Sequence, residues 1–442
     1  MSLITRVSRI RTLALSEASR ARRHLPAVAE VIGGQLAAQI LMAFSGLLIV
    51  RNLPKEQYAW FTLYSTIGAM MSLVADSGLG AGLNAHGGKV ASDPQALARL
   101  LTAARAFRVR LCVLSGTIIG CVGAYLLHKN GCPPLLSAVI LSASLVGMFL
   151  STSNQLNTII HNLVGHRRLV QSGSAVSQAI RLVLVGGCQL ASTLTTLTAS
   201  ITALAAQFVS VLWTSRRLPV QEHKRLADKE DVQKLGHYVR ETMPNALFAC
   251  IQAQIGILLL AMFGHTTEVA SLGALSRIAI LFSIFGSPLF FLAAPAFAKS
   301  STPSHLARIT STVLGSYVGL SLVAMVLVRL YPEPFFWLIG ATYSGFEREL
   351  IWIMVAQALA TVDTILWTVA LARGWIRRAW LSIPLAVLAQ VLVLLFVDPR
   401  SIIGVTQLSI AQTLARSLVA CTLGGLGLIA WRRRIALAKG QL

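Results

Sequence analysis

Long apolar stretches separated by short polar segments repeat along most of the chain. A bilayer core about 30 Å thick requires about 20 apolar residues in a spanning helix, and that length divides the pattern into twelve predicted spans. The predicted spans are residues 31–50, 59–79, 111–127, 135–156, 170–190, 197–213, 246–262, 272–294, 310–330, 350–372, 380–397 and 406–431. The sequence therefore predicts an all-α polytopic membrane protein.

Composition leads to the same class. Hydrophobic residues make up 55% of the 442 residues and charged residues 12%, whereas soluble domains contain about 25% charged residues. This balance excludes a secreted domain, a soluble cytosolic enzyme and a disordered scaffold. The six cysteines show neither a CxxC nor a Cys/His spacing, so neither a metal site nor a disulfide framework is expected.

Two lobes of six helices each are predicted, because the longest polar segment lies between the sixth and seventh spans. The boundaries that follow are a basic cytoplasmic N-terminal segment at 1–28, an N-lobe at 29–213, a solvated cytoplasmic linker at 214–242, a C-lobe at 243–431 and a cytoplasmic tail at 432–442. A faint repeat relates residues 46–56 to residues 256–268. Such a repeat is typical of transporters whose halves are related by an axis along the membrane normal.

Basic residues predict the orientation in the membrane. The formal net charge is +22, and 29 of the 38 Lys and Arg residues fall in segments on the side of the two termini, against 6 on the other side. By the positive-inside rule, both termini are expected in the cytoplasm. The same rule explains the net charge, so no nucleic-acid partner is expected.

Three short motifs resemble Wzx-type polysaccharide flippases, which belong to the multidrug/oligosaccharidyl-lipid/polysaccharide exporter superfamily. They are RNLPKEQYAWF at 51–61, after the first span, LVADSGLG at 73–80, at the end of the second, and MPN at 243–245, before the seventh. That family often has Gly where Ala59 stands here.

The resemblance implies a MATE-like fold in which two six-helix lobes face one another in a V around a central cavity. It also implies a flippase that translocates an undecaprenyl-pyrophosphate-linked oligosaccharide across the bacterial inner membrane by alternating access, for O-antigen, capsule or exopolysaccharide synthesis. The expected partners are this polyprenyl-pyrophosphate-linked glycan, the lipid bilayer, and a polysaccharide polymerase with its chain-length machinery.

Charged side chains inside a span cost about 2.5–3.5 kcal/mol each on insertion scales, so each one needs a reason. Five are expected there: Arg181, Arg277, Arg416, Asp76 and Asp363. A guanidinium stays ionised and binds phosphate oxygens in pairs, so the three arginines are candidates for the pyrophosphate. The alternative is that Arg181 pairs with Asp76, and Arg416 or Arg277 with Asp363, which would only join helices. Asp363 is the candidate for ion coupling, and Asp76 for a structural or gating role at a glycine-rich helix end.

Uncharged polar side chains in the spans are further cavity candidates, because sugar hydroxyls need hydrogen-bond donors and acceptors. They are Gln35, Gln39, Asn154, Asn157, Gln178, Gln252 and Gln357. Gln178 and Arg181 belong to one polar helical stripe, which must face protein or water rather than lipid. The alternative for each of these residues is an interhelical hydrogen bond worth about 0.6 kcal/mol.

No Walker A, GxSxG or HExxH motif occurs, so the chain is predicted to be a transporter without a cofactor and not an enzyme. Moving two negative charges outward across an inside-negative potential of about 100 mV would gain about 4.6 kcal/mol, which is enough to drive export of a pyrophosphate lipid. The rival functions are a cation-coupled multidrug exporter, which would have acidic cavity residues, and a lipid II flippase, for which about fourteen spans are expected. A membrane glycan polymerase or acyltransferase is a third alternative.

Overall fold

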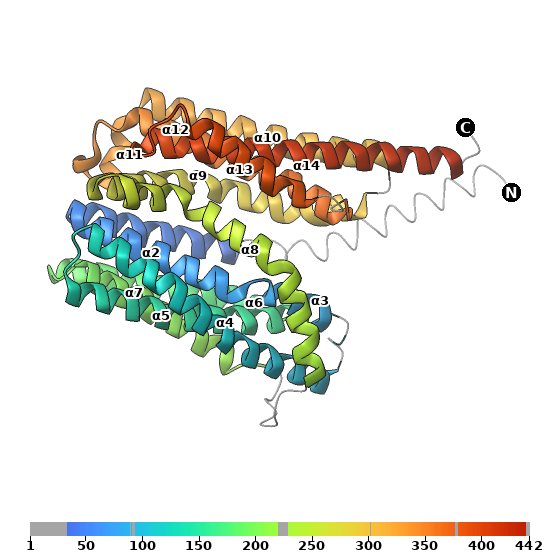
Figure 1. Ribbon diagram of the computed structural model, residues 1–442, viewed down its shortest axis with the longest axis horizontal. Coiled ribbons are helices and arrows are strands. Elements are labelled where there is room, and N and C mark those ends of the chain that lie inside the picture. The colour runs from blue at the N-terminus through green and yellow to red at the C-terminus, as the bar shows by residue number, and fades with distance from the viewer. Residues whose placement is uncertain are drawn as a thin grey trace.

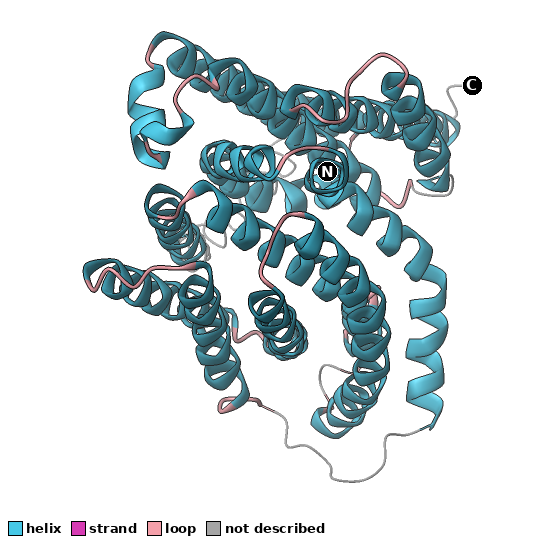
Figure 2. Cartoon of the chain, turned by 60° about the vertical axis from the view of Figure 1, so that its left-hand side comes forward, coloured by secondary structure: helices cyan, strands magenta, loops and turns pink. Residues whose placement is uncertain are grey.

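The structure, a computed structural model, describes residues 33–88, 90, 93–219, 229–300, 302–375 and 379–438. These residues form helices joined by short turns, and no strand occurs among them (Figure 2). Nine helices in this part of the chain are long and apolar enough to cross a membrane. The protein is therefore a multi-pass membrane protein. The predicted basic segment at 1–28 lies outside the described residues.

The helices form two groups that lie on either side of α8 (Figure 1). The first group comprises a helix at Gly33–Asn52, α2 (Lys55–Asp76), α3 (Leu79–Gly87), α4 (Pro94–Lys129), α5 (Pro134–Leu163), α6 (Arg167–Leu190) and α7 (Thr196–Ser215). After α8 (Lys229–Phe263), the second comprises α9 (Thr266–Lys299), α10 (Pro303–Leu330), α11 (Pro332–Ile339), η1 (Ala341–Tyr343), α12 (Glu347–Ala372), η2 (Ala379–Leu381), α13 (Ser382–Leu394) and α14 (Ile402–Ala438). We refer to the first group as the N-lobe and to α8–α14 as the C-lobe.

Local sequence explains several helix starts. The Asp93 carboxylate accepts hydrogen bonds from the backbone N–H groups of Gln95 and Ala96, at 2.9 and 3.2 Å, and Pro94 supplies the fixed backbone angle that suits a first helical position. Thr195 and Thr198 form a reciprocal capping box at the start of α7. Such caps satisfy the backbone N–H groups that the first helical turn leaves without partners.

Each of the twelve predicted spans overlaps a helix, with differences at the ends. The helix α13 has 13 residues, fewer than the span predicted at 380–397, and α14 continues to Ala438, into the predicted tail. The helix α8 begins at Lys229, inside the segment 214–242 that we expected to be a solvated linker. Leu235 and Val239 of this part are buried against α3 and α4. These apolar residues therefore pack in a core and do not face solvent.

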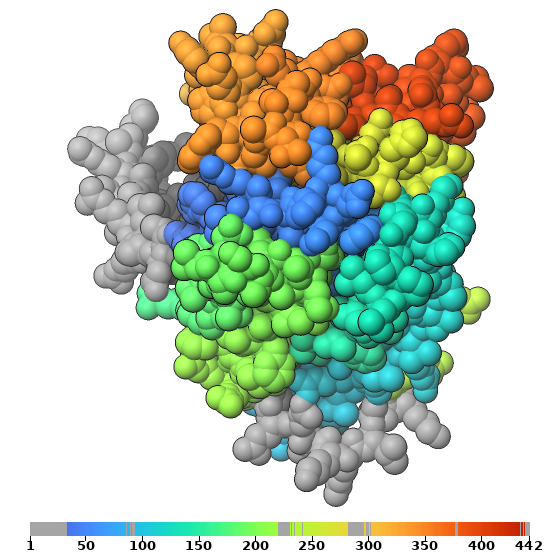
Figure 3. All heavy atoms as spheres, turned by 90° about the vertical axis from the view of Figure 1, so that its left-hand side faces the viewer, coloured from blue at the N-terminus to red at the C-terminus, as the bar shows by residue number. Residues whose placement is uncertain are grey.

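One end of the molecule holds a hydrophobic core shared by both lobes. The buried cluster there includes Ile49 and Phe61 from the N-lobe together with Leu260, Leu275 and Tyr343 from the C-lobe. In Figure 3, which faces this end, the segment coloured orange packs directly on the segment coloured blue. We call this region, which contains the turn before α2 together with α11 and η1, the closed end.

At the other end the two lobes have separate cores. One cluster joins α3, α4 and α5 to the first part of α8, with Leu83 and Leu235 fully buried. A second cluster, around Phe297, Tyr317 and Ile365, contains residues of the C-lobe alone. Apart from the contact made by α8, the lobes therefore share a core at the closed end and not at the opposite end.

Candidate functional site

Two arginines approach each other from the two lobes. Arg181 of α6 lies within electrostatic range of Arg277 of α9 and of the Tyr64 phenol on α2. The side chain of Arg277 lies against the helix Gly33–Asn52, because a Cβ added at Gly46 would be 3.6 Å from the Arg277 Cδ. The predicted spans that hold these arginines are far apart in sequence, and the packing of the lobes brings them together.

No carboxylate of the described residues forms an ion pair with either arginine of this pair. Among the described residues, the ion pair that forms inside the spans involves Arg416 instead. The Nε of Arg181 is buried, and no hydrogen-bond partner for it occurs in the described part of the chain. Two guanidinium groups repel each other more strongly in surroundings of low dielectric than in water. An anion placed between them would relieve that repulsion and satisfy unused N–H groups.

The polar stripe on α6 begins beside the helix Gly33–Asn52. A Cβ added at Gly34 would lie 3.1 Å from the Gln171 Cβ, and near the other end of the same helix Gln189 Nε2 donates to Asn52 Oδ1 at 2.9 Å. The helix Gly33–Asn52 therefore runs along α6. The Gln178 Oε1 is buried without a hydrogen-bond partner among the described residues.

The candidates Gln35 and Gln39 lie on the same helix at Gly33–Asn52 and are both partly buried. Gln39 lies about two helical turns before Gly46, the residue that contacts Arg277. The helix Gly33–Asn52, which carries these two candidates, thus contacts Gln171 of α6 through Gly34 and Arg277 of α9 through Gly46.

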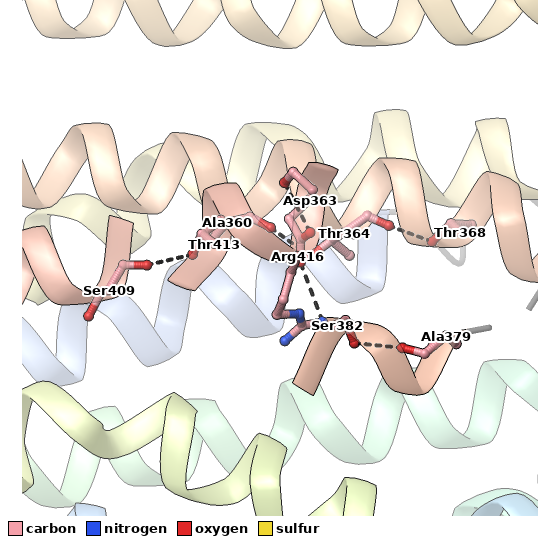
Figure 4. A network of polar contacts seen from close by, with 10 residues as sticks. Ala360, Asp363, Thr364, Thr368, Ala379, Ser382, Ser409, Thr413 and Arg416 are labelled. Carbon is pink, nitrogen blue, oxygen red and sulfur yellow. Dashed lines mark hydrogen bonds and ion pairs between the residues drawn. The ribbon is translucent and has the colours of Figure 1, made fainter. Parts of the chain in front are cut away.

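Arg416 is paired, which is the alternative that the sequence left open. Its Nη2 lies 3.4 Å from Asp363 Oδ2, and the Ser417 hydroxyl donates to Asp363 Oδ1 at 3.0 Å. Asp363 comes from α12 and Arg416 from α14, as Figure 4 shows. The carboxylate is buried, with 8% of its side chain exposed, whereas 29% of the Arg416 side chain is exposed. The guanidinium is therefore joined to Asp363 on one side and remains accessible on another.

This ion pair lines a cavity of about 380 Å³ inside the C-lobe. The walls come from α8, α9, α12 and α14, and two more of the predicted candidates, Gln252 and Gln357, also line it. Gln412 and Thr413 of α14 add an amide and a hydroxyl group. The cavity thus collects four of the predicted site residues, Asp363 included, in a place separate from Arg181.

Gln252 also makes an interhelical contact, which is the alternative stated for it, with a partner that the sequence did not identify. Its Nε2 donates to Gln390 Oε1 and its Oε1 accepts from Gln390 Nε2, both at 2.8 Å. Gln390 is the only amide in α13, a helix that is otherwise apolar after Ser382, and its position in an apolar run could have marked it as a functional or interhelical contact residue. Because each amide satisfies the other, this pair joins α8 to α13.

Asn154 and Asn157 lie in a polar network within the N-lobe and not among the other candidates. Asn157 accepts from Arg105 Nη2 at 3.0 Å through its Oδ1 and donates to Ser215 Oγ at 2.9 Å through its Nδ2. The Asn154 Oδ1 accepts from the Thr214 hydroxyl at 3.1 Å. These bonds join α4, α5 and α7, which is the interhelical alternative stated for both residues.

Asp76 is positioned at a helix junction. Its Oδ1 accepts from the backbone N–H of Gly80 at 2.9 Å, and the intervening Ser77 and Gly78 have positive φ angles of 36° and 86°. The Thr242 hydroxyl of α8 donates to the Ser77 carbonyl at 3.0 Å. The alternative pairing of Asp76 with Arg181 does not occur among the described residues, and the carboxylate instead accepts from the first turn of α3.

Aromatic and basic residues join the lobes at the closed end. The Arg51 guanidinium lies 4.4 Å from the Trp337 ring centroid, and the Lys55 Nζ lies 5.5 Å from that of Tyr343. The Tyr343 ring meets Tyr58 edge to face at 6.5 Å. Burial, together with the neighbouring Tyr58, raises the pKa of Tyr343, so its phenol stays neutral. The motif at 51–61 therefore carries much of this contact.

Comparison with known proteins identifies structures with a similar fold. No protein-family model and no curated protein sequence matches the chain. Among solved structures, an inward-facing multidrug resistance MATE family transporter of the MOP superfamily aligns with a TM-score of 0.65 and 13% identity, over 91% of this chain and 96% of that one. The chain has the MATE-type transporter fold. An outward-facing structure of such a transporter aligns with a TM-score of 0.58 and 13% identity, over 94% of this chain and 96% of that one.

Two other structures with the MATE-type fold have different functions in their descriptions. The inward closed conformation of the lipid II flippase MurJ aligns with a TM-score of 0.65 and 11% identity, over 92% of this chain and 98% of that one. A MOP superfamily transporter from Pyrococcus furiosus, described as having a binding pocket of reverse polarity that suggests a different function, aligns with a TM-score of 0.61 and 13% identity, over 93% and 95%. At these identities the likeness establishes the fold.

Proposed function

We propose that the protein is a flippase for a polyprenyl-pyrophosphate-linked oligosaccharide and that it works by alternating access between its two lobes. The observation that carries the proposal is the position of Arg181 and Arg277, which meet from opposite lobes without a neutralising carboxylate among the described residues. A pyrophosphate carries the charge and the acceptor oxygens that two guanidinium groups bind best. Because the arginines belong to different lobes, an anion held by both couples binding to the relative position of the lobes.

The shared core at the closed end supports the same proposal. Arg181 and Arg277 lie beside residues of the shared core, among them Val185, Leu275 and Ile278, and beyond this core the two lobes have separate cores. We infer from the positive-inside rule that the opposite end faces the cytoplasm and that both termini lie there. The headgroup would then enter from the cytoplasm, while the polyprenyl tail stays in the lipid.

Arg416 has a different part in this proposal from the one that the sequence suggested. Its pairing with Asp363 compensates its charge, so we assign the pyrophosphate to Arg181 and Arg277. The same pairing makes Asp363 a weaker candidate for ion coupling, because a proton would have to displace Arg416. Membrane potential acting on the pyrophosphate charge, about 2.3 kcal/mol per elementary charge and 100 mV, is sufficient as a driving force.

Reconstitution tests the proposal against its rivals. Purified protein in lipid vesicles would be supplied with lipid-linked oligosaccharide isolated from the source organism, with lipid II, and with a cationic dye, in separate experiments. We expect movement of the lipid-linked oligosaccharide between leaflets and none of the dye. Dye export would favour the multidrug exporter, and movement of lipid II alone would favour the lipid II flippase, which the MurJ alignment keeps as a full alternative. A polysaccharide polymerase and its chain-length machinery are the partners that the proposal implies.

A further inference from the structure

The cavity in the C-lobe has a polar lining with compensated charge. Asp363 and Arg416 neutralise each other there, and among the described residues no other charged side chain lines the cavity. An ion entering the cavity would add an uncompensated charge in surroundings of low dielectric, which is costly. A neutral ligand avoids that cost, so the charge balance favours an uncharged occupant.

The remaining lining residues offer both donors and acceptors. The side-chain amides of Gln357 and Gln412 line the cavity, and in the described part of the chain neither amide is engaged in a hydrogen bond. An amide both donates and accepts, and the Arg416 guanidinium carries five N–H groups, of which the contact with Asp363 uses one side. Sugar hydroxyls, which also both donate and accept, complement such a lining.

The size of the cavity suits a small ligand. Its volume of about 380 Å³ falls within the range of about 300–1,000 Å³ that is usual for small-molecule sites. Small residues such as Ala253, Ala356 and Ala360 form much of its wall, and they leave room that larger side chains would fill. In a helix interface that served only packing, amides beside a cavity would be expected to form hydrogen bonds with neighbouring side chains.

The cavity and the arginine pair lie on neighbouring faces of α9. Ser276 lines the cavity, while the next residue, Arg277, lies against Gly46 of the N-lobe. Consecutive residues of an α-helix point about 100° apart and rise 1.5 Å along the axis. The arginine pair and the cavity are therefore adjacent along α9, and a headgroup held at Arg277 would lie one residue along this helix from the cavity lining.

We propose that the C-lobe cavity is a glycan subsite, which binds neutral sugar hydroxyls of the cargo through Gln357, Gln412 and Arg416 while Arg181 and Arg277 hold the pyrophosphate. This inference rests on the proposed function and adds the part of the molecule that distinguishes a glycan-bearing lipid from its bare carrier. Asp363 is a positioning residue here, because it fixes the Arg416 guanidinium.

A binding comparison tests the subsite. The two probes are undecaprenyl pyrophosphate and the lipid-linked oligosaccharide isolated from the source organism, and binding to the purified full-length protein would be measured by native mass spectrometry. The variants are Ala360→Phe, which fills the cavity, and Gln357→Ala, which removes an amide without adding bulk. Leu418→Phe is the matched control, because Leu418 is 59% exposed on α14 and does not line the cavity.

We expect the wild type and Leu418→Phe to bind the glycan-bearing lipid about tenfold more tightly than the bare carrier, as one or two additional hydrogen bonds would give. Ala360→Phe and Gln357→Ala should lose this preference and still bind undecaprenyl pyrophosphate like the wild type. A preference that survives in both variants, or equal binding of the two lipids by the wild type, would overturn the subsite. Failure of the wild type to bind either lipid would instead overturn the proposed function.

Discussion

Gly273 of α9 and Thr62 of α2 meet across the lobes without room for a side chain on the glycine. A Cβ added at Gly273 would lie 2.6 Å from the Thr62 Oγ1 and 3.3 Å from its Cβ. Thr62 itself is buried, and its hydroxyl donates to the Tyr58 carbonyl at 2.9 Å. The contact fixes how closely α2 and α9 approach, and Arg277 lies one helical turn beyond it.

Replacing Gly273 by Leu should therefore force the lobes apart near the closed end. Overpacking of this kind costs about 1–3 kcal/mol, so the variant should lose most of its transport activity and melt at a lower temperature. Transport in vesicles and thermal unfolding in detergent would measure both effects. Gly315→Leu is the matched control, because a Cβ at Gly315 has no atom within 4 Å, and it should behave like the wild type. Equal activity of the two variants would show that this contact does not limit lobe movement.

The contact between Arg51 and Trp337 should stabilise the closed end. A cation–π contact at an exposed site contributes about 0.5–1 kcal/mol, and Trp337 is 63% exposed. In a variant without native cysteines, a Thr62→Cys probe should react with a water-soluble maleimide about two- to fivefold faster once Trp337 is replaced by Ala. Trp380→Ala removes a similarly exposed ring, 65%, and should leave the rate unchanged. If neither variant changes the rate, the aromatic contact does not hold the lobes together.

The ion pair between Asp363 and Arg416 should appear as an energetic coupling. Asp363→Asn leaves the guanidinium without its partner, and a loss of about 1–3 kcal/mol in stability is expected. Arg416→Gln should produce a loss of similar size because it strands the carboxylate. The double variant should lose less than the sum of the two, as measured by unfolding in a double-mutant cycle. Strictly additive losses would mean that the two side chains do not interact.

The membrane-spanning helices of this protein could be predicted from sequence, because the thickness of the bilayer sets the length of the apolar run that each helix needs. The differences have local causes. Apolar residues such as Leu235 and Val239 occur among charges at 229–242, and their burial on α3 and α4 depends on tertiary packing that local composition does not reveal. The shortness of α13 likewise could not be read from an apolar run that continues beyond Leu394.

The candidate site was predictable as a set of residues and not as an arrangement. Intramembrane charge identified Arg181, Arg277 and Arg416 equally, because all three lie in apolar runs. Their difference arises from neighbours on other helices: Asp363 neutralises Arg416, while Arg181 faces Arg277 and Tyr64. The amide pair of Gln252 with Gln390 also depends on the packing of α8 against α13, which no local pattern specifies.

The arginine pair is the central claim, and its removal tests that claim most directly. The measurement is movement of lipid-linked oligosaccharide between leaflets of reconstituted vesicles by the wild type, by Arg181→Gln/Arg277→Gln, by Arg181→Lys/Arg277→Lys, and by Arg110→Gln, which removes an exposed arginine of α4. Losing charge-assisted hydrogen bonds to pyrophosphate should slow the Gln double variant about 10- to 100-fold. The Lys double variant should retain part of the rate, and Arg110→Gln all of it. Undiminished movement in the Gln double variant would contradict the account.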